Sequence, residues 1–60
     1  MNILIVEDNM NKLEQIRDYL NGAIENANID SAHSFNSGMK KILSGHWNLI
    51  VLDMSLPTYE

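Results

Sequence analysis

The chain has 60 residues, of which 45% are hydrophobic and 20% charged, a composition that is typical of a globular segment and too apolar for a disordered tail. So short a chain buries only roughly 60% of the surface of its unfolded form, which limits it to one small domain or a piece of a larger one. Its net charge of -4 argues against nucleic acid or an anionic membrane as a partner. The absence of cysteine excludes disulfides and thiolate metal sites, and no segment has membrane-spanning length, so a cytoplasmic location is expected.

The first half of the chain predicts a strand followed by a helix. Residues 2–6 read NILIV, a continuous apolar run that is typical of a strand buried on both faces of a parallel sheet. The abrupt change to Glu7-Asp8-Asn9 favours a strand that meets a loop over a buried helical turn. Apolar residues then recur at spacings of three and four, which predicts a helix over residues 10–26. These residues are Met10, Leu13, Ile16, Leu20, Ile24 and Ala27.

Two details concern the limits of this helix. Asn9 or Asn11 can cap its start, and Asn11 with Glu14 forms a variant of the capping box. The pair Asn21-Gly22 is also a turn signal, but the apolar stripe continues past it. We therefore predict one helix that tolerates the glycine at a cost of about 1 kcal/mol.

The second half predicts a thin strand, a helix and another apolar strand. Residues 29–34 alternate only loosely between polar and apolar, which suits an edge strand. Ser34 is a candidate N-cap for a helix over residues 35–44, which Gly45 ends. The apolar face of this helix would consist of Phe35, Met39, Ile42 and Leu43. Residues 48–53 form the second strongly apolar strand, and its last residue is a carboxylate, Asp53.

The predicted order β-α-β-α-β is that of an α/β fold with a parallel sheet and right-handed crossovers. The strands over residues 2–6 and 48–53 have the composition of a core, and the strand over 29–34 has that of an edge. We therefore predict the strand order 2-1-3, with the first strand in the middle.

Three acidic residues follow the two apolar strands directly. Glu7 and Asp8 come after the first strand, and Asp53 ends the third. Adjacent parallel strands deliver their carboxyl ends to one edge, where open α/β sheets bind ligands. Crowded carboxylates repel each other unless a cation neutralises them, and Mg²⁺ prefers such oxygen ligands. Any one of these acids alone would more often be a solvated loop residue; their joint placement predicts a site.

The motifs ILIVEDN and LIVLDMSLP resemble the first and third strands of response-regulator receiver domains. In that family an apolar strand ends in an acid pair, and another ends in the phospho-accepting aspartate, with a proline four residues later. Glu7-Asp8, Asp53 and Pro57 match this pattern. The resemblance covers all 60 residues but only about the first half of a receiver, so it implies a flavodoxin-like receiver fold reduced to residues 1–60 of an incomplete domain.

The resemblance implies a role for each matching residue. Asp53 would be the nucleophile that holds the phosphoryl group. Asp8 would be a direct Mg²⁺ ligand, Glu7 a second acid that often acts through water, and the backbone carbonyl of Ser55 a further ligand. The complete domain would take phosphate from a histidine kinase or phosphotransfer protein and signal to an output domain or effector. Such a domain is a phosphoacceptor rather than an enzyme, beyond catalysing its own phosphorylation.

Two alternative functions remain, because the resemblance does not cover every residue that a complete receiver uses. The switch Ser/Thr and the Lys of a complete receiver lie beyond the matched motifs, and Thr58, Lys40 and Lys41 do not replace them. A pseudo-receiver that binds partners without phosphorylation is therefore the chief alternative. A half-domain that acts through self-association is the other, since the strand over residues 48–53 would present an open edge at which a homodimer could form.

Overall fold

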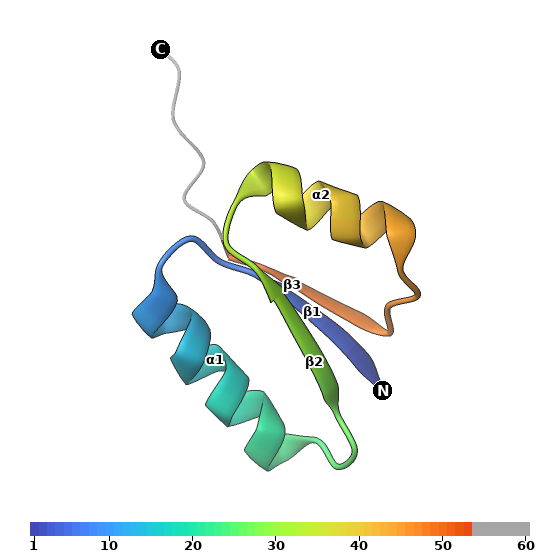
Figure 1. Cartoon of the computed structure of the whole chain (residues 1–60). Coiled ribbons are helices and arrows are strands. Elements are labelled where there is room, and N and C mark those ends of the chain that lie inside the picture. Colours follow the sequence, from blue (N-terminus) through green and yellow to red (C-terminus); the bar gives the residue numbers. More distant parts are fainter. Residues whose placement is uncertain (54–60) are drawn as a thin grey trace.

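The computed structural model describes residues 1–53, which form three parallel strands and two helices (Figure 1). In chain order the elements are β1 Asn2–Val6, α1 Met10–Ala23, β2 Asn28–Ala32, α2 Phe35–Ser44 and β3 Leu49–Leu52. This arrangement confirms the predicted α/β class, with the order β-α-β-α-β of a flavodoxin-like fold.

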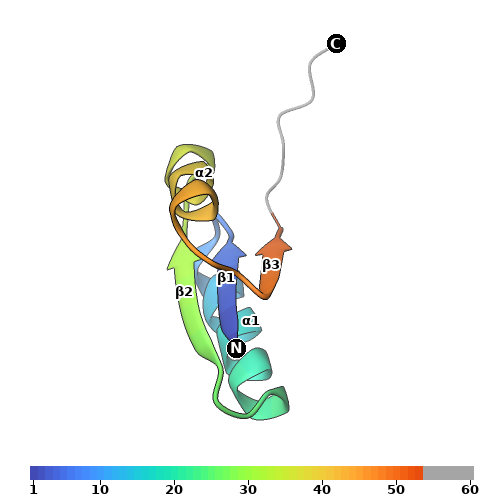
Figure 2. The ribbon, with the colours of Figure 1, turned by 90° about the vertical axis from the view of Figure 1, so that its right-hand side faces the viewer.

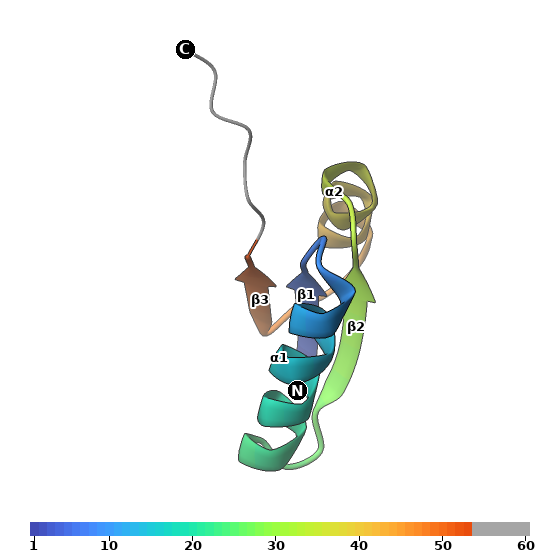
Figure 3. The same cartoon turned by 90° about the vertical axis from the view of Figure 1, so that its left-hand side faces the viewer.

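The sheet has the order β2-β1-β3, as predicted, with β1 in the middle. β1 pairs in parallel with both neighbours, and Val6 is opposite Ala32 on one side and Leu52 on the other. The arrowheads of all three strands therefore lie at one end of the sheet, and α1 and α2 lie on opposite faces (Figures 2 and 3). Glu7 and Asp53, the residues that follow β1 and β3, consequently lie at the same edge of the sheet.

The core consists of two clusters, one on each face of β1, because successive side chains of a strand point to opposite sides. Ile3 and Ile5 pack with Leu13 of α1, and the partly buried Ile16, Leu20, Ile24, Ala27, Ile29 and Val51 surround them. On the other face, Leu4 and Val6 pack with Ala32, next to Ile42 and Trp47. The apolar residues of β1 are at most 1% exposed, which confirms that this strand is buried on both faces.

Helix α1 begins where predicted but ends three residues before the predicted end at residue 26. Asn9 is its N-cap, with its side chain accepting a hydrogen bond from the Lys12 amide at 3.1 Å, so the Asn11 capping box does not form. Ile24 has extended backbone and Asn26 has a φ of 57°, which ends the helix. The apolar stripe nevertheless continues, because Ile24 and Ala27 pack on the same cluster from the turn after the helix.

Helix α2 spans Phe35–Ser44, which are the predicted residues. Ser34 accepts a hydrogen bond from the Ser37 amide at 3.1 Å, and Gly45 is the C-cap. Its predicted apolar face is largely exposed, however: Phe35 is 53% and Leu43 80% exposed. The side that approaches the sheet is that of Gly38 and Ile42, because the absence of a side chain at Gly38 lets the helix lie close to Val6.

The bounds of the two outer strands differ from the prediction. β2 covers Asn28–Ala32 rather than 29–34, and β3 covers Leu49–Leu52 rather than 48–53. β3 lies at an edge of the sheet, as the predicted strand order requires (Figures 2 and 3). Its composition is that of a core strand, but of its residues only Val51 packs against a core cluster. Three of its side chains are substantially exposed: Leu49, Ile50 and Leu52.

Candidate acidic site

The register of the sheet places Glu7 and Asp53 at equivalent positions, one residue beyond the paired residues Val6 and Leu52. Backbone hydrogen bonds continue the sheet through both residues. The Glu7 amide donates to the Ala32 carbonyl and the Asp53 amide to the Val6 carbonyl, each at 3.0 Å. The main chain thereby fixes both acids at the same edge of the sheet, which is the edge that the sequence predicted for them.

Glu7 is a buried carboxylate, only 2% exposed. Its Oε1 accepts a hydrogen bond from the Asn9 amide at 3.1 Å, which links the strand end to the cap of α1. Its Oε2 accepts no hydrogen bond from any residue in the described part of the chain. A buried carboxylate oxygen without a partner is costly, so this atom favours the approach of a cation or donor.

Lys12 supplies a cation at this point, which was not predicted from the sequence. Its Nζ lies 2.9 Å from Oδ2 of Asp53 and 3.9 Å from Oε2 of Glu7. The hydrogen bond to Asp53 and the charge of Asp53 raise the pKa of Lys12 above its usual 10.5, and the charges of Glu7 and Asp8 act in the same direction. Lys12 therefore stays protonated and neutralises part of the acidic charge.

The position of Lys12 in the helix is the feature of the sequence that could have identified it as a site residue. It is the third residue of α1, where the partial positive charge of the helix N-terminus disfavours a cation. A lysine at this unfavourable position, four residues after Asp8, is consistent with an acidic partner close by, which here is Asp53.

The other two predicted site residues differ in how far the structure describes them. Asp8 is exposed and lines a shallow depression with Glu7, Asn9 and Lys12. Ser55 and Pro57 lie outside the described residues.

The acidic side chains at this edge meet some, but not all, of the requirements of the Mg²⁺ that the sequence predicts. Carboxylate oxygens suit that ion, and the unpaired Oε2 of Glu7 is an atom that a cation would satisfy. Within residues 1–53, no three acidic or histidine side chains lie close enough together to hold a metal ion as they stand. The carboxylates suit the ion in chemistry, but the ammonium of Lys12 lies between those of Glu7 and Asp53.

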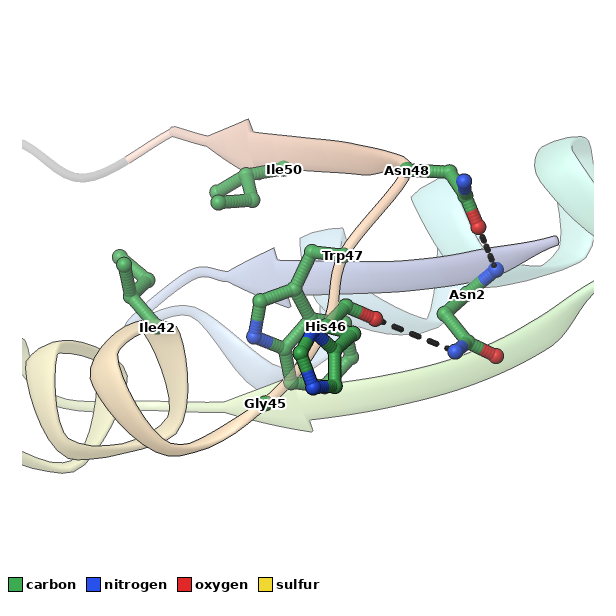
Figure 4. Close-up of a pocket in the computed structure, with 7 residues that line it drawn as sticks. All are labelled: Asn2, Ile42, Gly45, His46, Trp47, Asn48 and Ile50. Atoms are coloured by element: carbon green, nitrogen blue, oxygen red, sulfur yellow. Dashed lines mark hydrogen bonds between the residues drawn. The ribbon is translucent and has the colours of Figure 1, made fainter.

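A second pocket lies at the opposite end of the sheet (Figure 4). Its polar groups already satisfy one another: the Asn2 amide donates to the Asn48 side chain at 2.7 Å, and the Asn2 side chain donates to the His46 carbonyl at 3.1 Å. Trp47 donates from Nε1 to the Lys41 carbonyl at 2.8 Å. These bonds attach the connection between α2 and β3 to the start of β1, which is a structural role.

Neither helix within residues 1–53 has the length and hydropathy of a membrane-spanning segment. No protein-family model matches the chain. No solved structure matches it either.

Curated relatives do match the chain. They are the proteins named "Response regulator ArlR" of Staphylococcus aureus strains Mu50, MW2 and USA300, each 39% identical over 56 residues. These residues make up 93% of this chain, and the chain spans about a quarter of each relative's length, 25%. The chain is therefore similar in sequence to part of these response regulators, and its order of strands and helices resembles that of the N-terminal half of a receiver domain.

Proposed function

We propose that these residues form the acidic half of a phospho-accepting receiver site in a two-component phosphorelay, with Asp53 as the acceptor. The observation that supports this most is the position of Asp53: it directly follows β3 and lies beside the buried Glu7, with one cation between their carboxylates. Similarity to response regulators supports the same class of function. The donor would be a histidine kinase or a phosphotransfer protein in the cytoplasm.

The chemistry asked of Asp53 is a single displacement at phosphorus. One Oδ atom forms a bond to phosphorus while the P–N bond of a phosphohistidine breaks. The electron pair of the broken bond goes to the ring nitrogen, which leaves as neutral imidazole when the other nitrogen carries the proton. Asp53 is an exposed enough nucleophile for this approach, because its side chain is 45% accessible.

Positioning and charge neutralisation are the main requirements of such a transfer. The hydrogen bond from the Asp53 amide to the Val6 carbonyl holds the nucleophile at the edge of the sheet. Glu7, Asp8 and Asp53, with the Ser55 carbonyl, would hold Mg²⁺, which when bound neutralises charge on the phosphoryl oxygens. Phosphorylation would then be signalled to an output domain or effector protein.

The experiment is to treat the protein at its natural length with acetyl phosphate and Mg²⁺ and to measure its intact mass. We expect the mass of one added phosphoryl group, and none in Asp53→Asn, because an amide does not attack phosphorus. Asp18→Asn, at an exposed position of α1, is the matched control and should be labelled like the parent. Full labelling of Asp53→Asn would rule out the assignment.

Two observations favour a second function, that of a non-phosphorylated module that binds partner proteins. The exposed apolar side chains of β3 offer a surface for another chain, and Lys12 already neutralises Asp53. The same experiment separates the two, since such a module would show no Mg²⁺-dependent labelling.

A further inference from the structure

Lys12 is anchored over the acidic site by the start of α1. Its amide donates to the side chain of the N-cap Asn9 at 3.1 Å, so its backbone is part of a capped first turn. From there the side chain extends to Asp53 at 2.9 Å. The side chain is 51% exposed, so it is free to exchange this contact for water.

The ion pair leaves the site incompletely neutralised. Nζ of Lys12 is 3.9 Å from Oε2 of Glu7, too far for a hydrogen bond, and that buried oxygen has no hydrogen-bond partner within residues 1–53. One ammonium thus satisfies Asp53 but not Glu7. A smaller, doubly charged cation that contacts both carboxylates would neutralise Glu7 as well as Asp53, whereas Lys12 neutralises mainly Asp53.

We propose that Lys12 is a built-in competitor of the divalent cation: it holds Asp53 in the metal-free protein and must leave Asp53 before Mg²⁺ binds to Asp53 and Glu7. The inference rests on the proposed function and adds regulation of the same site. Two cations do not share one carboxylate oxygen at contact distance without repulsion, so the pair between Lys12 and Asp53 weakens the affinity for metal.

The test measures Mg²⁺ affinity in the protein at its natural length, from the amide NMR shifts of Glu7 and Asp53 on stepwise addition of MgCl₂. Lys12→Met removes the ammonium and keeps the apolar stem. Lys40→Met is the matched control, because it makes the same change at an exposed position of α2, on the other face of the sheet. Circular dichroism on all samples verifies that the variants fold.

We expect Lys12→Met to bind Mg²⁺ about three- to tenfold more tightly than the parent, since an exposed ion pair and its repulsion of metal are lost. Lys40→Met should change the affinity by less than about twofold because solvent screens its charge. Lys12→Arg, which keeps the charge, should bind nearly as weakly as the parent, which a purely structural role of Lys12 does not predict.

Two results would overturn the inference in distinguishable ways. Equal Mg²⁺ affinities of Lys12→Met and Lys40→Met would reject the competition and leave the magnesium site of the proposed function standing. Absence of shifts at Glu7 and Asp53 in every variant would reject both the competition and the magnesium site.

Discussion

Glu7 is the residue at which fold and proposed function conflict most directly. Its burial at the end of the central strand leaves one carboxylate oxygen without a hydrogen bond within residues 1–53. Leaving a buried polar atom unsatisfied costs about 1–3 kcal/mol. A protein tolerates such a cost where the group serves binding, and a bound cation would recover it.

Magnesium should therefore stabilise the protein through Glu7. At a concentration ten times its dissociation constant, a ligand specific for the folded state raises the free energy of unfolding by about 1.4 kcal/mol. We expect this increase in the parent and its loss in Glu7→Gln, measured as the shift of the thermal melt on adding MgCl₂. Glu25→Gln, at an exposed position after α1, should retain the shift. An undiminished shift in Glu7→Gln would show that magnesium acts elsewhere.

The sequence predicted Glu7 and Asp53 at one edge because strand ends follow from the apolar runs, and the parallel order follows from the alternation of elements. It did not predict Lys12, since the direction of a long side chain depends on the register of β3 against β1. Ser55 remains a prediction, because it lies outside the described residues.

At the scale of elements, α2 is held to the sheet by close approach rather than by its apolar face. A Cβ atom added at Gly38 would lie 2.8 Å from Cγ1 of Val6, a buried side chain of the central strand. By contrast, a Cβ atom added at Gly22, near the end of α1, would meet nothing within 4 Å. The two helical glycines thus form a matched pair.

We expect Gly38→Ala to lower the free energy of unfolding by about 1–2 kcal/mol, because overpacking costs more than the improved helix propensity contributes. Gly22→Ala should instead raise it by about 0.5–1 kcal/mol. Chemical denaturation of both variants beside the parent measures the difference. A Gly38→Ala variant as stable as Gly22→Ala would show that α2 is free to move away from β1.

A polar contact also joins α2 to β2. Nζ of Lys41 lies 2.9 Å from Oδ1 of Asp30 and donates to the Ser31 carbonyl at 2.7 Å. The hydrogen bond from Lys41 lowers the pKa of Asp30 below its usual 3.8, although burial opposes the shift. Since the carboxylate form is favoured in the folded state, its contribution to stability is present above pH 3.8 and is lost as the pH falls through the lower folded pKa.

Asp30→Asn should therefore be less stable than the parent near neutral pH, by about 0.2–1 kcal/mol, because the pair is exposed to solvent. The difference should shrink as the pH falls below 3.8 and disappear below the lowered pKa of Asp30, where the folded parent's carboxylate is protonated as well. Denaturant melts of both proteins across this pH range give the comparison. A difference that is independent of pH would mean that Lys41 does not stabilise the charge of Asp30.

On the scale of the whole molecule, β3 is the least protected element. Within the described residues it pairs only with β1, and Leu49, Ile50 and Leu52 are 37%, 40% and 62% exposed. The sequence predicted this open edge from the strand order, although the apolar composition of the strand is that of a core strand. Burial of each such side chain would contribute roughly 1.5–3 kcal/mol.

We predict that the 60-residue chain by itself does not remain a stable monomer, because an open apolar edge invites pairing with another strand. It should dimerise, or stay partly unfolded and aggregate, and Leu52→Lys should reduce the association since a charge at the edge opposes pairing. Size exclusion with light scattering, combined with circular dichroism, gives the answer. A folded monomer with a cooperative melt would refute this prediction.

Whether Asp53 carries the phosphoryl group is measured most directly by locating the modification itself. After reaction with acetyl phosphate and Mg²⁺, borohydride reduces an aspartyl phosphate to homoserine, which peptide mass spectrometry identifies by position. We expect homoserine at residue 53 and aspartate retained at residues 8, 18 and 30. Homoserine at another aspartate, or at none, would contradict it.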